Sequence, residues 1–139
     1  MTKEEEIAKN LTMIEYYKQQ LESIDAQLQY LLTVLAEYQR AKTTVEQLHA
    51  ADPNTEVLIP LGGGTFVNGS VKDTSNVLIG IGAGLVVEKS IDEALVKLDD
   101  RSKKIQQNQE KIVAIGQKIQ SDAEELSKKT QKMIEEAQR

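Results

Sequence analysis

The chain has 139 residues, the length of one ordinary domain, and carries 17 Lys and Arg against 22 Asp and Glu, a net charge of −5. This acidic balance argues against nucleic-acid binding, because a nucleic-acid binder needs a basic stripe that displaces phosphate counterions. The absence of cysteine excludes disulfides, thiolate nucleophiles and cysteine-ligated metals. We expect a cytoplasmic protein with no membrane partner, because no run approaches the roughly 18 apolar residues of a membrane span and the start MTKEEEIAKN is unlike a signal peptide.

The first segment, residues 1–51, is charged, free of glycine and marked by an apolar stripe. Alternate steps of three and four from Ile7 to Val45 reach an apolar or aromatic side chain everywhere except at Asn10 and Lys42. A stripe sustained over so many heptads predicts a coiled-coil helix. Pro53 predicts the end of this helix, because proline cannot continue one.

The middle segment, residues 52–90, changes to the alternating pattern of strands. EVLIPL and TFVNGSVKD flank Gly62–Gly64, NVLIGI and LVVEKS flank Gly82–Gly84, and the turn-forming DTSN lies between the two pairs. The pattern predicts two successive β-hairpins. Isolated hairpins are marginal in water and expose unpaired edges, so we expect this segment to complete its sheet with other subunits.

The stretch GIGAGLVVEKS within this segment begins like a phosphate-binding loop. A dinucleotide fingerprint needs Gly-x-Gly-x-x-Gly and a helix directly after it, but Leu85 stands at the third glycine position and strand-like residues follow. Gly62–Gly64 does not lead into the Gly-Lys-Ser/Thr of a nucleotide-triphosphate loop either. We therefore expect turn glycines rather than nucleotide binding, and we expect Gly80 to let a neighbouring group come close.

The third segment, residues 91–139, carries a heptad seam with large apolar side chains at one position and mostly small or polar side chains at the other, which we call the thin position. The large positions recur every seven residues: Ile91, Leu98, Ile105, Ile112, Ile119, Leu126 and Met133. Four residues after each comes a mostly small or polar one: Leu95, Ser102, Gln109, Gly116, Ala123, Thr130 and Ala137. Such a seam needs bulk from its partner, which the Leu- and Tyr-rich first segment supplies. We expect the two helices to pair antiparallel, with the chain ends side by side.

No catalytic constellation is visible in the sequence. His49 is the only histidine, and its place near the end of the first helix predicts a solvated residue rather than a base. Acidic pairs such as Asp99–Asp100 and Glu124–Glu125 are adjacent and point to different parts of a helix, whereas paired catalytic carboxylates need a pocket. We expect no enzyme, no cofactor and no metal beyond weak carboxylate sites.

Apolar residues near the two chain ends form a candidate interaction patch. Three of them, Leu11, Met13 and Ile134, lie beside the seam, and their neighbours Ile14, Leu126 and Met133 lie on it. If the helices splay there, an adaptable apolar patch becomes exposed, and such patches mark interaction sites. The alternative is that these side chains pack between the helices, or that the ends fray without a function.

The order of a long helix, two hairpins and a second long helix resembles the α-class subunit of the prefoldin (GimC) family, of archaeal type. The most specific likeness is VLIPLGGGTFVNGSVKDTSNVLIGIGAGLVVEKSIDEA, residues 57–94, and the helices match in length and heptad character. The resemblance implies an α+β fold: a long antiparallel two-helix coiled coil with two central β-hairpins that build an oligomeric β-barrel.

The resemblance also implies a function, that of a cytosolic, ATP-independent co-chaperone. Two α-class and four β-class subunits would form a hexamer that captures unfolded polypeptides at its coiled-coil tips and delivers them to a group II chaperonin. The implied assembly contacts are Val57, Ile59, Leu61, Phe66, Val67, Val77, Ile79, Ile81, Leu85 and Val87. The implied client contacts are Ile7, Leu11, Met13, Ile14, Leu126, Met133 and Ile134. The main rival is a structural coiled-coil spacer or a filament-forming relative, and an enzyme is a distant third.

Overall fold

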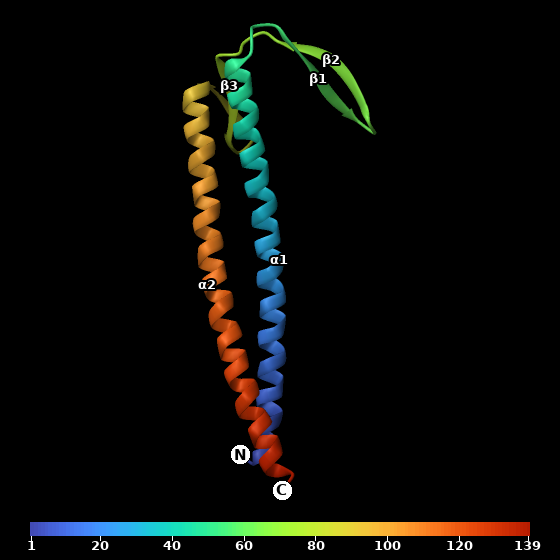
Figure 1. Ribbon diagram of the computed structural model, residues 1–139, viewed down its shortest axis with the longest axis vertical. Helices are drawn as coiled ribbons and strands as arrows, with labels where there is room; N and C mark the ends of the chain where they lie inside the picture. Colours follow the sequence, from blue (N-terminus) through green and yellow to red (C-terminus); the bar gives the residue numbers. More distant parts are fainter. The chain divides into compact units, whose positions relative to one another are not determined.

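The computed structural model describes all 139 residues, and two long helices and four strands joined by short turns make up most of the chain (Figure 1). The elements in chain order are α1 Lys3–Ala50, β1 Thr55–Gly62, β2 Thr65–Val71, β3 Asn76–Gly82, β4 Leu85–Ser90 and α2 Ile91–Ala137. The expected order of helix, two hairpins and helix is therefore confirmed. The chain divides into two compact units: a helical unit, Met1–Val34 with Ile105–Arg139, and a hairpin unit, Leu35–Lys104.

Both helices begin at side chains that bind their free backbone N–H groups. At the start of α1 the backbone N–H of Glu5 donates to Thr2 Oγ1, and the backbone N–H of Thr2 donates to Glu5 Oε2, each over 3.1 Å. At the start of α2 the backbone N–H of Glu93 donates to Ser90 Oγ over 3.2 Å. Caps of this kind stabilise a helix by about 1 kcal/mol and fix where it starts.

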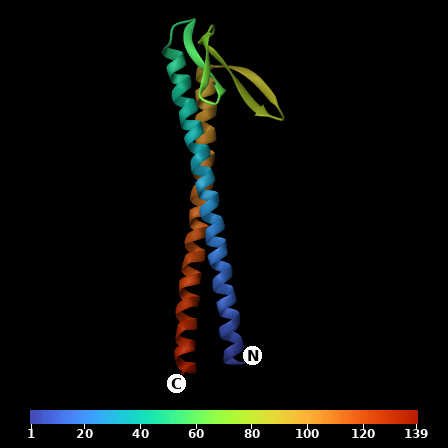
Figure 2. The same cartoon turned by 90° about the vertical axis from the view of Figure 1, so that its right-hand side faces the viewer.

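In the helical unit the two helices run antiparallel and side by side (Figures 1 and 2). The α1 seam positions in this unit are all buried or half-buried: Ile7, Asn10, Ile14, Tyr17, Leu21, Ile24, Leu28 and Leu31. A Cβ built at Gly116 would lie 3.3 Å from Ile24 Cγ2, so bulk from α1 fills a thin position of α2, as expected. The ion pair between Lys3 Nζ and Glu136 Oε2, 3.7 Å apart, joins the two ends of the chain.

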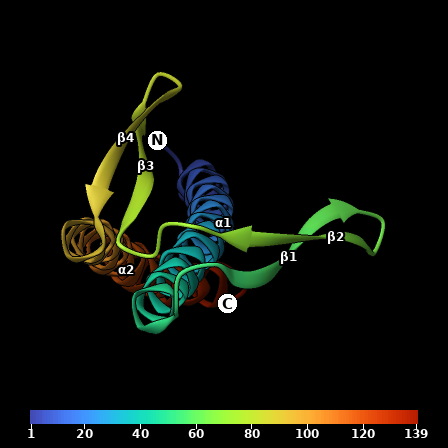
Figure 3. The ribbon, with the colours of Figure 1, turned by 90° about the horizontal axis from the view of Figure 1, so that it is seen from above.

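The hairpin unit contains two separate two-stranded antiparallel sheets, β1–β2 and β3–β4 (Figure 3). The hairpins repeat one design twenty residues apart: Ile59 pairs with Val67 as Ile79 pairs with Val87. Each strand pair shifts register just before its turn, at Leu61 and at Ile81. This shared irregularity is a β-bulge, which bends the strand and strengthens its twist.

The two-residue turns require positive φ at both central positions, as in hairpin turns of type I′. Gly63 and Gly64 have φ of 59° and 76°, and Ala83 and Gly84 have φ of 53° and 74°. The glycines therefore act as turn residues, as expected. Ala83 adopts a left-handed backbone conformation, which is strained because its Cβ comes too close to the following carbonyl oxygen.

The buried core of the hairpin unit comes from β3 and from the first turns of α2. Its buried apolar side chains are Ile79, Ile91, Ala94 and Leu98. The backbone N–H of Ile91 also donates to the carbonyl of Ser75 over 3.1 Å.

The Arg101 side chain approaches Gly80 only at its carbonyl oxygen, over 2.6 Å, and the space of the missing Cβ stays empty, because nothing lies within 4 Å of a Cβ built there. The close approach occurs at Gly69 instead, where a built Cβ would lie 2.7 Å from Ile59 Cδ1. Gly69 faces Val57 in the strand register, so the neighbouring Ile59 side chain leans diagonally across it.

Candidate interaction surfaces

Uncovered apolar side chains gather on the two hairpins. Of the ten side chains for which the sequence predicts assembly contacts, Ile79 is buried at 8 % exposure and Val77 and Val87 are half-buried. The other seven are exposed and are called the hairpin surface: Val57, Ile59, Leu61, Phe66, Val67, Ile81 and Leu85. Exposed apolar surface of this kind marks interaction sites on soluble proteins.

Both faces of the strands are apolar, which the predicted set did not include. Leu58, Leu78 and Val86 are also exposed, and they alternate along the strands with the predicted assembly contacts. The continuous apolar runs VLI and LVV carry this signal in the sequence, because strands covered on both faces have such runs. The hairpins therefore need apolar cover on each side.

The strand edges are a second feature of the hairpins. Each hairpin is its own sheet, so its outer edges carry unpaired backbone groups that are templates for pairing with another chain. On β3 one such group is bound by a side chain: Arg101 Nη2 donates to the carbonyl oxygen of Gly80 over 2.6 Å. This hydrogen bond fastens the second hairpin to α2.

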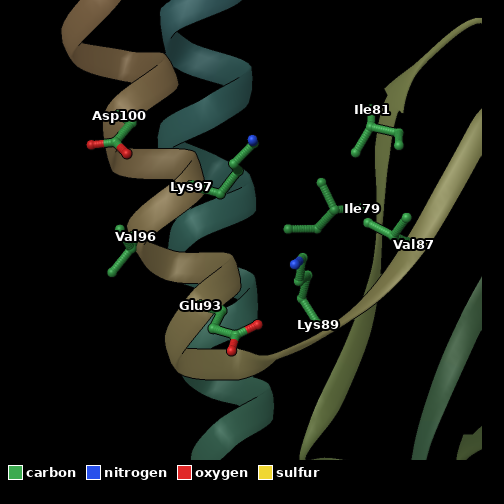
Figure 4. Close-up of a pocket in the computed structure, with 8 residues that line it drawn as sticks. All are labelled: Ile79, Ile81, Val87, Lys89, Glu93, Val96, Lys97 and Asp100. Atoms are coloured by element: carbon green, nitrogen blue, oxygen red, sulfur yellow. The ribbon is translucent and has the colours of Figure 1, made fainter.

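A crevice of about 200 Å³ lies between the second hairpin and α2 (Figure 4). Ile79 extends from β3 toward the helix, and Ile81 and Val87 add to the apolar wall. The charged residues at the crevice are two lysines and two acids: Lys89, Lys97, Glu93 and Asp100. A drug-sized ligand needs roughly 300 Å³ or more, so this space suits one or two aliphatic side chains instead.

The candidate client contacts near the chain ends are unequally exposed. Leu11 is 50 % exposed and Met13 is 39 % exposed. The other five are half-buried: Ile7, Ile14, Leu126, Met133 and Ile134. Met133 takes part in the seam, because the side-chain amide of Asn10 donates to its sulfur over 3.8 Å. The helical unit thus leaves only part of this patch uncovered.

A larger apolar exposure, which the seam pattern did not single out, lies further along the helical unit. Its members are Tyr30, Leu32, Val113 and Ile115, which are 69, 51, 41 and 54 % exposed, and we call them the arm band. The signal was a run without charge, because AQLQYLLTV, residues 26–34, and IVAIGQ, residues 112–117, contain no acidic or basic residue.

Charged groups in the structure act on local geometry. Backbone and side-chain hydrogen bonds from Ser75 and Asn76 lower the pKa of Asp73, which organises the turn between the hairpins. A hydrogen bond and the charge of Lys103, 3.0 Å away, lower the pKa of Asp99, with a smaller contribution from Lys42. The Asp73 hydrogen bonds therefore stabilise the turn between the hairpins, and the Asp99 ion pairs lie on the exposed surface of α2.

His49 is exposed in the last turn of α1, as expected. No group of three or more His, Cys, Asp or Glu side chains is arranged to hold a metal ion. Neither helix contains a stretch that is both long and apolar enough to span a bilayer.

Two long antiparallel helices joined by two hairpins with uncovered apolar faces define a coiled-coil subunit built for assembly. The family described as prefoldin subunit matches residues 17–136. The chain belongs to the prefoldin family, as a subunit of the α type.

The relatives agree over nearly the whole chain. Prefoldin subunit alpha of Archaeoglobus fulgidus is 32 % identical over 126 residues, which cover 91 % of this chain and 92 % of the relative. Prefoldin subunit alpha of Methanobrevibacter smithii is 29 % identical over 128 residues, which cover 92 % and 87 %. Prefoldin is a family of chaperones, and membership supports a co-chaperone role.

Two solved structures share the fold. A chain of the filamentous PFD from Methanocaldococcus jannaschii has a TM-score of 0.75 at 22 % identity, and the match covers 84 % of this chain and 96 % of that one. The prefoldin beta subunit from Thermococcus strain KS-1 has a TM-score of 0.60 at 17 % identity, with 91 % and 90 % covered. The fold of coiled coil plus hairpins is therefore that of prefoldin subunits.

Proposed function

We propose that this chain is the α subunit of an ATP-independent co-chaperone that captures unfolded polypeptides at its coiled-coil tips and delivers them to a group II chaperonin. The observation that carries the proposal is the division of exposed apolar surface between the hairpins and the helical unit. One set of side chains needs permanent cover from partner subunits, and the other set is free to take up a changing client.

The hairpins are the assembly region in this proposal. Residues 52–90 join β-class subunits into a β-barrel, and residues 1–51 and 91–139 form the coiled-coil arm. Support comes from the hairpin surface and the unpaired strand edges, since a two-stranded hairpin is marginal alone and gains stability from added strands. The expected assembly contains two α and four β subunits in the cytoplasm.

Client binding then depends on several arms acting together. Single apolar contacts at Leu11 or Met13 are weak, but arms held in one assembly raise the effective concentration of each for the same polypeptide. Burial of apolar surface requires no nucleotide. Such contacts release a client readily, which suits transfer to a chaperonin.

Aggregation of a chemically denatured enzyme tests this function. The chain assembled with a β-class subunit should suppress the aggregation, and the triple variant Leu11→Ser, Ile14→Ser, Met133→Ser should assemble normally but suppress much less. Full suppression by the assembled triple variant would contradict binding at these tip residues. No suppression by the unmodified assembly would contradict the co-chaperone function itself.

A structural spacer or filament subunit is the second candidate. One chain with this fold comes from a filamentous prefoldin, which makes self-assembly through the hairpins a concrete alternative. A spacer would be inert in the aggregation assay, and negative-stain electron microscopy of the chain alone would reveal filaments in place of discrete particles.

A further inference from the structure

The first hairpin contains a dipeptide whose chemistry the assembly role does not use. Asn68 is followed by Gly69 inside β2, and no other asparagine of the chain precedes a glycine. The backbone nitrogen after an asparagine can attack the side-chain amide carbon of that asparagine. Glycine favours the attack, because it has no side chain to obstruct it and its backbone reaches conformations that other residues avoid. Asn68 is therefore the asparagine of this chain that is most prone to spontaneous deamidation.

The packing of the hairpin favours glycine at this position. A Cβ built at Gly69 would lie 2.7 Å from Ile59 Cδ1 and 3.8 Å from Val57 Cγ2. A larger residue would have to displace the end of the Ile59 side chain, which leans across the strand. The reactive dipeptide is thus tied to the way β1 and β2 pack together.

The closed hairpin holds the dipeptide in an unreactive geometry. Deamidation requires the Gly69 nitrogen to turn back onto the Asn68 side chain, whereas a strand has an extended backbone with ψ of about 135°. Pairing of Gly69 with Val57 keeps β2 extended. Asn68 itself is exposed, so water reaches its side chain, but the reaction has to wait until β2 leaves β1.

The first hairpin has little to hold it closed. It is a two-stranded sheet of its own, and large apolar side chains such as Leu58 and Phe66 are 65 and 57 % exposed. The second hairpin, in contrast, has Ile79 buried and is fastened to α2 by the hydrogen bond from Arg101 to Gly80. A two-stranded hairpin is marginally stable in water and opens locally, so added strands and apolar cover would keep it closed.

We propose that Asn68 is a spontaneous deamidation site that marks subunits left without their partners. The Gly69 nitrogen loses its proton to water and forms a bond to Asn68 Cγ. The bond from Cγ to Nδ2 breaks, and Nδ2 takes up a proton and leaves as ammonia. Water then opens the succinimide ring at either carbonyl, which gives aspartate or isoaspartate without any oxidation or reduction. The proposal rests on the proposed assembly, because partner subunits are what would hold the first hairpin closed.

The product alters the hairpin in charge and in backbone length. The strand register places Asn68 opposite Leu58, and Phe66 lies two residues away on the same face. Aspartate puts a negative charge on this face, and covering an unpaired charge in an interface is unfavourable. Isoaspartate adds one carbon atom to the backbone, so the residues beyond it no longer match their partners in β1. A deamidated subunit should therefore assemble poorly.

The test follows Asn68 in the isolated chain by peptide mass spectrometry in mildly alkaline buffer, with isoaspartate detected by enzymatic methylation. The same chain unfolded in guanidinium chloride gives the reference rate. Two matched variants, Gly64→Ala and Gly84→Ala, add the same strain to equivalent turn positions of the two hairpins, where φ is 76° and 74°. Asn76 is an internal control, because the β-branched Val77 follows it and its amide donates to Asp73 Oδ2 over 3.2 Å.

Asn68 should react about tenfold more slowly in the folded chain than in guanidinium chloride, yet faster than Asn76. Gly64→Ala should speed the reaction at Asn68 about two- to fivefold, while Gly84→Ala leaves it unchanged. Equal rates in the two variants, or in the folded and unfolded chain, would overturn the route through hairpin opening. An unreacted Asn68 in the folded chain, or a reaction as fast at Asn76, would overturn the site itself.

A second variant covers a failure of Gly64→Ala to fold. If Gly64→Ala loses helix content in circular dichroism, Thr65→Ala is used with the same criterion. Thr65→Ala weakens the same turn by removing the hydrogen bond from Thr65 Oγ1 to the carbonyl oxygen of Gly62, which is 2.7 Å long.

Two measurements on the complex with a β-class subunit test the marking. In a complex whose mass confirms assembly, Asn68 should react about tenfold more slowly than in the isolated chain, and an equal rate would overturn protection by partners. Asn68→Asp should associate about tenfold more weakly than Asn68→Ser, which is polar and neutral, and equal association would overturn the marking. If no complex forms at all, the proposed assembly fails and the marking fails with it, whereas the rates in the isolated chain still decide whether Asn68 deamidates.

Discussion

The repeated hairpin design gives a matched pair of positions for testing the assembly role. Ile59 and Ile79 occupy equivalent places, each paired with a valine in the facing strand. Ile79 is 8 % exposed in the core of the hairpin unit, whereas Ile59 is 47 % exposed. The same substitution, isoleucine to alanine, should therefore act at different stages: folding for Ile79 and assembly for Ile59.

The magnitudes follow from burial. Truncation of a buried isoleucine to alanine costs about 2–5 kcal/mol, and because the site lies beside an open crevice we expect Ile79→Ala to fall near 2–3 kcal/mol. About half of the Ile59 side chain is already in water, so Ile59→Ala should cost about 1 kcal/mol or less in the isolated chain. If assembly buries the rest, it should weaken association by about 1–2 kcal/mol, or roughly 5–30-fold.

Urea unfolding of the isolated chain measures the first effect, and sedimentation of the complex with a β-class subunit over a dilution series measures the second. Ile79→Ala should lower the unfolding midpoint more than Ile59→Ala does. Ile59→Ala should raise the concentration at which the complex dissociates. An unchanged dissociation midpoint for Ile59→Ala would refute the claim that the hairpin surface is buried by partner subunits.

Three other predictions concern the turns, the seam and pH. Ala83→Gly should stabilise the second hairpin by about 0.5–1 kcal/mol, because it removes the backbone strain at φ 53°. Gly63→Ala should destabilise the first hairpin by a similar amount. Hydrogen exchange of the strand amides measures both effects, and faster exchange in Ala83→Gly would contradict the prediction. Gly116→Leu should destabilise the helices by about 1–3 kcal/mol in thermal unfolding, because a side chain there meets α1, and an unchanged melting temperature would contradict the packing. Lys103 lowers the pKa of Asp99 in the folded chain, so as pH falls the Asp99 carboxylate is protonated in the unfolded state before it is protonated in the folded state. The Asp99–Lys103 pair therefore stabilises the fold above about pH 4, and this stabilisation is lost as pH falls further. Asp99→Asn should flatten that part of the melting-temperature profile at low salt, and an identical profile would show that the pair contributes nothing.

Periodicity was sufficient to predict the helices and the hairpins. The heptad stripe from Ile7 to Val45 and the thin position at Gly116 specify which helix faces meet, since burial follows the stripe. The alternating runs and the glycine turns specify both hairpins, because only positive φ fits a two-residue turn of this type.

Exposure at individual positions was harder to predict, because it depends on what the pairing leaves uncovered. Met13 and Ile134 both lie beside the seam in the sequence, but Met13 is 39 % exposed and Ile134 is half-buried. Ile59 and Ile79 have the same local pattern, and only the packing of the second hairpin on α2 separates them. The heptad pattern places Tyr30 off the seam, but it does not show that the neighbouring side chains leave Tyr30 69 % exposed.

Native mass spectrometry of the chain mixed with a β-class subunit and an unfolded polypeptide tests the central claim most directly. We expect a complex of two copies of this chain and four β-class subunits with one polypeptide bound, formed without nucleotide. A chain that stays monomeric in that mixture, or a complex that never carries the polypeptide, would contradict the account.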